Sequence, residues 1–238
     1  MLRNSRVISA EKIYISNLIL HFDERERVMR LFDFGPAANA QRVQVFIREK
    51  GIKIQTEQLN VREGQQFLEP YTSMNPFHCV PFLELDDGTI ISESLSICRY
   101  LEEIYPEPAL FGKTAETRAI IDMWLRRFEL DGFIPMLHAV RNHVENFKGR
   151  VVPGTRTDLP QMPEMVTRGI EMAEIFLDRV EPHVAENEFI AGSSFSVADI
   201  TAFFTVRLTN PLGLDISKSH PAVFGWMDRM SKRKAFEI

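Results

Sequence analysis

The stretch that decides the fold is NPFHCVPFLELDDGTIISES, residues 75–94. Apolar and polar side chains alternate through FLEL, as in a half-buried strand, and the run DDGT at 86–89 carries the Asp-Gly signal of a two-residue hairpin. Pro81 has no N–H to give to a sheet, so it must stand at the start or edge of the strand. We therefore expect a cis Val80–Pro81 bond, with the main chain of Val80 facing outward and available to a ligand.

A helix is predicted to begin directly behind this hairpin, at Glu93 and Ser94. The N–H groups at a helix N-terminus attract anions, so this helix end and the Ser94 hydroxyl can hold a carboxylate. Glu93, which we expect to be a buried acid, can hold an ammonium group. Together with the backbone of Val80, these features predict a receptor for a ligand that resembles an amino acid.

The residues on either side of this stretch predict an α/β fold with a small mixed sheet. Residues 29–34 form a short apolar strand, a helix follows, and residues 52–61 alternate as a second strand. Behind the hairpin, residues 97–105 carry apolar side chains at the spacing of one helical face. Prolines then end that helix and open a linker that reaches about residue 114.

Everything after the linker has the pattern of helices, so residues 29–108 and 115–238 are predicted to form two domains. Pro135 is expected to kink a long helix, and residues 148–163, which hold several Pro and Gly, should form a loop. The run SVAD at 196–199 predicts a capping box whose aspartate stabilises the fold. The helix behind it is apolar nearly all round and should be buried.

Composition narrows the range of functions. The chain has 238 residues, 45% hydrophobic and 26% charged, as in an ordinary soluble globular protein with a real core. A net charge of −5 argues against a nucleic-acid partner, and no apolar run approaches the ~20 residues that a membrane span needs. Two cysteines, Cys79 and Cys98, fit a reducing compartment. His138 and His143 lack the spacing of a metal-binding helix, so no metal site is expected.

Residues 75–94 resemble the glutathione-binding half of the cytosolic glutathione transferase superfamily, in which VP is followed by ES. Upstream, LFDFGPAANAQRVQVFIREKGI is similar to the first strand and helix of that family. Downstream, ICRYLEEIYPEPALFG is similar to its second ligand-side helix and linker, and SFSVADI to the start of its buried helix. The resemblance covers residues 29–238. It implies a thioredoxin-like α/β N-terminal domain plus an all-α C-terminal domain, in a cytoplasmic homodimer.

The first 28 residues match nothing in that family. They are an added element, a targeting peptide or a segment that is not native, in which case translation starts at Met29. Acidic residues such as Glu11 and Asp23 argue against a transit peptide, which is poor in acids.

The resemblance also implies which residues bind glutathione. These are Gln66, His78, Val80, Pro81, Glu93 and Ser94. Gln66 and His78 stand where some relatives hold the glycyl carboxylate; the alternatives are a solvated loop for Gln66, which is slightly favoured, and simple loop filling for His78.

Many relatives activate the glutathione thiol with a Tyr, Ser or Cys after the first strand, and that position here is Ala37, which has no donor. Asn39 can aim its amide at the sulfur, or it is a plain helix N-cap. A theta-like fungal and bacterial group, to which this chain is most similar, lacks the usual side chain and is thought to use a positioned water. RFELDGFIPMLHAVRNH resembles that group, so His138 or Arg141 can act over the site; an ordinary surface or packed His138 is the alternative.

The resemblance therefore predicts a glutathione transferase that adds glutathione thiolate to small hydrophobic electrophiles in detoxification, or that reduces hydroperoxides. Trp124, Phe128 and His138 are expected to line an electrophile pocket between the domains. No metal or redox cofactor is expected beyond the co-substrate glutathione. Because Ala37 offers no donor, a non-catalytic glutathione-binding or regulatory protein remains the rival, and a glutathione-dependent dehalogenase or isomerase is a third reading.

Overall fold

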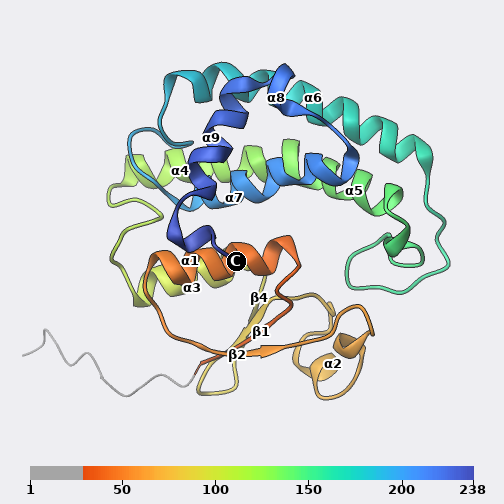
Figure 1. Cartoon of the computed structure of the whole chain (residues 1–238). Helices are drawn as coiled ribbons and strands as arrows, with labels where there is room; N and C mark the ends of the chain where they lie inside the picture. Colours follow the sequence, from red (N-terminus) through yellow and green to blue (C-terminus); the bar gives the residue numbers. More distant parts are fainter. Residues whose placement is uncertain (1–28) are drawn as a thin grey trace, which may run out of the picture.

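The computed structural model describes residues 29–238, and the interpretations of residues 1–28 fall outside that range. Within it, a small mixed sheet with its helices is followed by a helical domain, as predicted (Figure 1). The sheet has four strands in the order β2-β1-β3-β4. Their bounds are β1 Arg30–Asp33, β2 Gln55–Gln58, β3 Phe82–Glu84 and β4 Ile90–Ser92. β2 is parallel to β1, whereas β3 is antiparallel to both β1 and β4.

The central strand β1 separates two apolar layers. Leu31 and Phe32 are each 1% exposed but point to opposite faces, as successive residues of a strand do. Leu31 belongs to the large core that continues into the helical domain. Phe32 stacks on Phe82, with ring centroids 4.5 Å apart, in a smaller cluster on the other face.

The hairpin between β3 and β4 is present, but its loop is longer than the predicted two residues. Glu84 pairs with Ile90, which leaves residues 85–89 between the paired ends. Gly88 has φ +82°, a left-handed conformation that a residue without Cβ adopts at no steric cost. The Asp-Gly signal therefore located the turn correctly, and the extra residues follow the common pattern of a longer loop with glycine in the left-handed position.

Helices cover both faces of this sheet. α1 (Ala38–Glu49) and α3 (Ser94–Ile104) lie between the sheet and the helical domain, as Figure 1 shows. The short α2 (Tyr71–Met74), preceded by the 3-10 turn η1 (Gln65–Phe67), packs on the Phe32 side. The beginnings of α1 and α3 thus stand at the boundary between the two domains.

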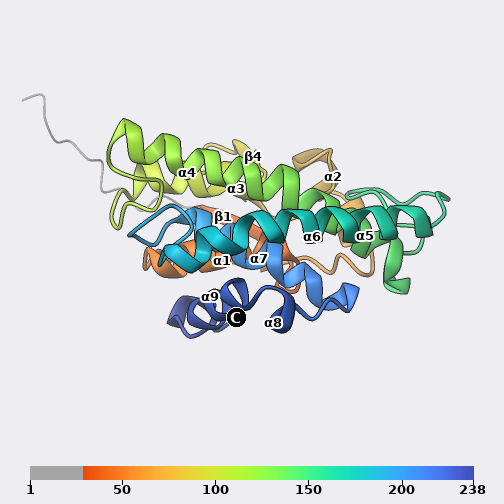
Figure 2. The ribbon, with the colours of Figure 1, turned by 90° about the horizontal axis from the view of Figure 1, so that it is seen from above.

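The helical domain surrounds the central helix α7. Its elements are α4 Ala115–Arg127, η2 Phe128–Phe133, α5 Ile134–His143, η3 Glu145–Phe147, α6 Pro163–Glu186, α7 Val197–Val206, η4 Arg207–Leu212, α8 Ile216–Ser219, α9 Pro221–Ser231 and η5 Lys234–Phe236. Figure 2 shows the long α4 and α6 extending along the molecule. The expected kink at Pro135 takes the form of a π-helical turn, η2, that comes just before the proline.

The start of α7 confirms the predicted capping box. Ser196 is the N-cap, and its Oγ accepts from the Ala198 N–H at 3.2 Å. Asp199 reaches back to accept from the Ser196 N–H at 3.0 Å and from the Ile190 N–H at 2.8 Å. Every residue of α7 is buried, as its apolar pattern predicted. Burial raises the pKa of the Asp199 carboxyl to about 6, against the hydrogen bonds that lower it.

α1 is fastened to the helical domain near both of its ends, at Gln41 and at Glu49. Arg233 makes two hydrogen bonds of 2.9 Å to the carboxylate of Glu49, and Arg207 donates to Gln41. In residues 29–238, no helix combines the length and the apolar character required to span a bilayer. Nor does this part of the chain gather three His, Cys, Asp or Glu side chains into a group that can hold a metal ion.

Candidate functional site

The site begins at the N-terminus of α1. Ala37 is the N-cap residue, with φ −79° and ψ 133°, and its carbonyl accepts the first helical hydrogen bond from Gln41 N–H at 2.9 Å. No side chain caps this helix end, so the N–H groups of Ala38, Asn39 and Ala40 lack helical partners. The interpretation of Asn39 as a plain N-cap is therefore wrong, because Ala37 holds that position.

A buried arginine joins this helix end to the beginning of α3. Arg42 donates from Nη1 to Asn39 Oδ1 at 3.1 Å and to Ser94 Oγ at 2.6 Å. Arg42 is 2% exposed and Ser94 is 5% exposed. Asn39 and Ser94, predicted from different parts of the sequence, are thus held by a single guanidinium group.

Glu93 is the N-cap of α3, where the sequence placed it, but it is exposed rather than buried. Its φ of +69° lies in the left-handed region, which is uncommon for a residue with a side chain. Such strained residues concentrate at ligand sites. The expectation of a buried acid is wrong, because the Glu93 carboxylate caps no N–H group of α3 and lies at the surface.

The Val80–Pro81 bond is cis, as predicted. β3 begins only at Phe82, and among the described residues the N–H and C=O groups of Val80 make no hydrogen bond. This backbone edge is therefore available for pairing with an extended ligand, in the way that a sheet edge accepts another strand.

The loop before Val80 is built around Asn75, which is 2% exposed. Its side chain donates to the Cys79 carbonyl at 2.8 Å and accepts from the Phe77 N–H at 3.2 Å. His78 has φ +52°, and its ring lies 5.0 Å from that of Phe67 at the end of η1.

Gln66 belongs to the same η1 turn and is 4% exposed. Its Oε1 is buried and has no hydrogen-bond partner among the described residues. An unsatisfied buried amide oxygen is costly and points to a missing partner.

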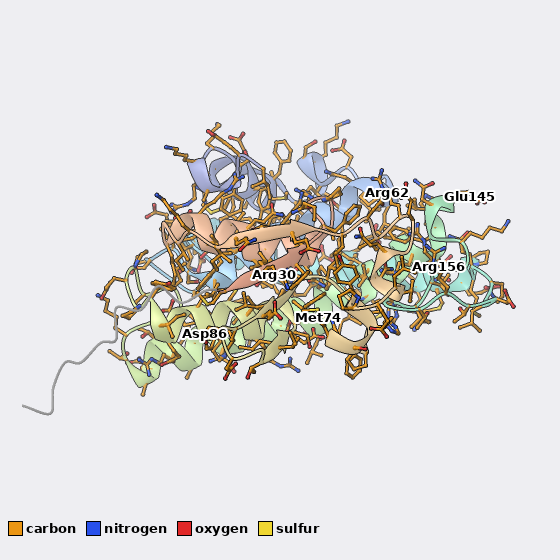
Figure 3. All side chains as sticks on the ribbon, turned by 90° about the horizontal axis from the view of Figure 1, so that it is seen from below. Arg30, Arg62, Met74, Asp86, Glu145 and Arg156 are labelled. Carbon is orange, nitrogen blue, oxygen red and sulfur yellow. The ribbon has the colours of Figure 1, made fainter. Side chains whose placement is uncertain are left out.

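A long loop of the helical domain, residues 144–162, reaches this part of the N-terminal domain. Arg156 donates to the Arg62 carbonyl at 3.2 Å, and the two arginines lie together in Figure 3. A Cβ at Gly154 would collide with the Phe77 carbonyl oxygen and would lie 2.9 Å from Cys79 Sγ. The helical domain therefore covers one end of the candidate site.

Comparison with known proteins agrees with this architecture. Residues 38–104 match the family model "Glutathione S-transferase, N-terminal domain", and residues 166–234 match "Glutathione S-transferase, C-terminal domain". Glutathione S-transferase F10 of Arabidopsis thaliana is 30% identical over 204 residues, which span 84% of this chain and 91% of the relative. The chain belongs to the glutathione S-transferase family.

Solved structures place this transferase beside the Gtt2 class. A class Gtt2 transferase of Vibrio parahaemolyticus is 30% identical with a TM-score of 0.75, covering 87% of this chain and 95% of that one. Gtt2 from Saccharomyces cerevisiae is 26% identical with a TM-score of 0.78, covering 87% and 98%. The predicted membership, including the similarity to fungal and bacterial members, is confirmed, and the chain is a transferase that uses glutathione.

The transferase's helical domain brings Arg141 near the Cys79 loop. Burial and the nearby Glu93 raise the pKa of the Cys79 thiol, and the half-buried Arg141 opposes them by lowering it. Its Nη1 donates to the Arg150 carbonyl at 2.5 Å. His138 is exposed on α5, and its role stays a prediction.

Trp124 and Phe128 do not line an open pocket of the transferase. Phe128 is 0% exposed and meets Phe176 edge-on, with 5.0 Å between the ring centroids. Trp124 packs against His183, with 4.2 Å between the ring centroids. This expectation is corrected: both rings face α6 and fill the core of the helical domain.

Arg42 and Gly154 are the positions of the candidate site that sequence reasoning missed. The signal for Arg42 was an arginine directly beside Val43 on the apolar face of a helix whose N-terminus serves as a ligand site. A charged group on such a face has to be paired or buried for a reason.

Proposed function

We propose that this transferase conjugates the glutathione thiolate to small hydrophobic electrophiles and serves in detoxification. The observation that carries the proposal is the uncapped N-terminus of α1, on the helix turn that also presents Asn39. Phe133 of the helical domain lies against Arg42, 5.2 Å from ring centroid to guanidinium, so an apolar side chain borders this position. A hydrophobic co-substrate fits beside the thiol at such a boundary.

The energetics of thiol activation agree with a site that has no hydroxyl at position 37. A free thiol has a pKa of about 8.5, and lowering it by about two units takes roughly 2.7 kcal/mol. A helix N-terminus supplies about 0.3–1 kcal/mol, and up to about 2 kcal/mol in a partly buried site. A hydrogen bond to a charged group adds about 1.5–3 kcal/mol, so the α1 N–H groups and the Asn39 amide are sufficient together.

The protein's own cysteines are poor nucleophiles, which leaves this role to glutathione. Burial raises the pKa of Cys98 to about 12. Burial also raises the pKa of Cys79, and the carboxylate of Glu93 raises it further. Because only a thiolate attacks an electrophile, neither side chain competes with a glutathione thiol held at the α1 N-terminus.

In this proposal, glutathione extends from the start of α3, past the backbone of Val80, to the η1 turn. Its cysteinyl backbone pairs with Val80, and its γ-glutamyl carboxylate accepts from the Ser94 hydroxyl at the start of α3. The exposed Glu93 carboxylate attracts the γ-glutamyl ammonium. Gln66 and His78, on the η1 side of the cis bond, receive the glycyl end.

The deciding experiment is a glutathione titration followed by ultraviolet absorbance of the thiolate. We expect saturable binding with bound thiolate at neutral pH, and then turnover with an aromatic halide electrophile or a hydroperoxide. S-methyl glutathione, which cannot ionise at sulfur, is the matched control. Binding without thiolate at neutral pH would support the non-catalytic glutathione-binding protein instead.

We also propose a homodimer that works in the cytoplasm. The α4–η2–α5 segment exposes an apolar stripe formed by Ile120, Met123, Leu130 and Ile134. Phe77, in the loop before the cis bond, is 73% exposed, which is unusual for so large an apolar ring.

Light scattering should give a dimer, and Phe77→Asp should give a monomer. Phe224→Asp, at a half-exposed ring on α9, should stay dimeric; a monomeric wild type would contradict the proposal.

A further inference from the structure

Arg42 is buried without a matching negative charge. It is 2% exposed, and its Nε and Nη2 atoms have no hydrogen-bond partner among residues 29–238. No carboxylate of this part of the chain lies within ion-pair distance of the guanidinium. Burying a charge costs several kcal/mol unless a partner compensates it, so a buried arginine with two idle nitrogens requires an explanation.

The one nitrogen that is used sets the orientation of two ligand-binding groups. Nη1 donates to Ser94 Oγ at 2.6 Å and to Asn39 Oδ1 at 3.1 Å. Because the serine oxygen accepts this bond, its own proton is available to donate elsewhere. Because the asparagine carbonyl oxygen is occupied, its NH₂ group is the end that remains available. Arg42 therefore turns both side chains into donors, which is what a carboxylate and a thiolate require.

The groups around Arg42 do not neutralise its charge. The charged or titratable groups that act on it are Glu129, Cys98 and Glu93, and burial opposes them by lowering the Arg42 pKa. Glu129 and Glu93 act from a distance rather than in contact, and Cys98 stays neutral because burial raises its pKa to about 12. The Phe133 ring covers the guanidinium on the helical-domain side.

We propose that Arg42 is the positioning residue of the glutathione site, holding Ser94 and Asn39 as outward donors and supplying the fixed positive charge behind them. The inference rests on the proposed function, because it assigns the γ-glutamyl carboxylate to Ser94 and the sulfur to Asn39. It adds that one buried guanidinium orients the donor for the γ-glutamyl carboxylate and the donor for the sulfur. A tripeptide that carries a carboxylate and becomes a thiolate is the ligand that needs both.

The test compares Arg42→Gln and Arg42→Lys with a matched arginine. Arg207→Gln is the control, because Arg207 is a partly buried arginine that likewise contacts α1 but donates to Gln41 rather than to Ser94 and Asn39. The readouts are the glutathione Kd, the pKa of the bound thiol from ultraviolet absorbance, and the split between kcat and KM.

In Arg42→Gln we expect the thiol pKa to rise by about one unit, with an about tenfold fall in kcat/KM below that pKa and a several-fold weaker Kd. Arg42→Lys keeps the charge but not the fork, so the thiol pKa should recover in part while the Kd stays weak. Arg207→Gln should leave both unchanged.

Unchanged thiol pKa and Kd in a folded Arg42→Gln protein would overturn the proposal. Should that variant fail to fold, Arg42→Lys decides, and wild-type values for both readouts would overturn it equally. A wild type that binds glutathione without forming thiolate defeats the proposed function. The Kd of the Arg42 variants then still tests whether Arg42 orients Ser94.

Discussion

The N-termini of α1 and α7 solve the same problem in opposite ways. Both leave the N–H groups of a first turn without helical partners. At α7, Ser196 and Asp199 satisfy them, and Asp199 also accepts from the Ile190 N–H at 2.8 Å. At α1, Ala37 offers no side chain, and the helix end stays open. A helix end that the chain closes serves stability, whereas one that the chain leaves open is available to an anion.

The largest effect is expected where the helix end is closed. Asp199→Ala leaves the buried N–H groups of Ile190 and Ser196 without an acceptor. Each such donor costs about 1–3 kcal/mol, so the free energy of unfolding should fall by about 3 kcal/mol. Chemical denaturation measures this, with Ser196→Ala as a milder control at about 1 kcal/mol. Full stability with lost activity would assign Asp199 to the site instead.

The same carboxyl gives a pH dependence of known sign. Its pKa is raised in the fold from 3.8 to about 6, so the folded state favours the protonated form. The stability that this provides is complete below about pH 4 and is lost as the pH rises through about 6. The difference in unfolding free energy between wild type and Asp199→Ala should therefore be about 2.5 kcal/mol larger at about pH 4 than at about pH 7. A pH-independent difference would contradict the raised pKa.

At the ligand end of α3, Ser94→Ala should weaken glutathione binding by about 1.5–3 kcal/mol, the loss of a hydrogen bond to a charged group. Calorimetry measures the change, and Ser96→Ala, an exposed serine of the same helix, is the matched control. Unchanged affinity would remove Ser94 from the site.

At the open end of α1, Asn39→Ala should raise the pKa of the bound thiol by about one unit, because one donor to the thiolate disappears while the helix N–H groups remain. Activity falls without vanishing, and glutathione affinity changes much less. The acidic limb of the kcat/KM profile against pH reports this pKa. A limb that does not move would transfer the role to a water held by His138 or Arg141.

The smallest effect comes from closing the open end as α7 is closed. Ala37→Asp supplies a side-chain cap and should stabilise the fold by about 1 kcal/mol. The same carboxylate uses the free N–H groups and repels a thiolate, so catalysis should fall. Ala37→Ser is the comparison, because its hydroxyl can also donate to the sulfur. A stabilised Ala37→Asp enzyme with full activity would show that the open N-terminus of α1 is not needed for the anion.

Much of the architecture was predictable because its signals are local. The hairpin, the cis bond and the capping box each depend on neighbouring residues with strict backbone requirements. The places of Val80 and Ser94 in the fold, just before β3 and at the first residue of α3, were predicted for the same reason. A proline at a strand start and a serine at a helix start are local signals.

The errors concern directions that only tertiary packing decides. Trp124 and Phe128 belong to an amphipathic pattern, and nothing local says that their face turns to α6 rather than to the domain boundary. Glu93 was expected to be buried, but its side chain caps no N–H group of α3 and is exposed. Arg42 was overlooked because its partners, Ser94 and Phe133, lie far away in the sequence.

The contact at Gly154 sets a rule for exchanging the irregular segment 144–162 in this enzyme. Residues 144–162 are long and irregular, which makes them an obvious segment to replace when new specificities are wanted. One point of that segment is fixed, because any side chain at Gly154 would strike the Phe77 carbonyl, in the loop before the cis bond. Grafted loops that keep glycine there can dock on the N-terminal domain. Those that do not will displace residues 75–79, which lead directly into the exposed backbone edge at Val80.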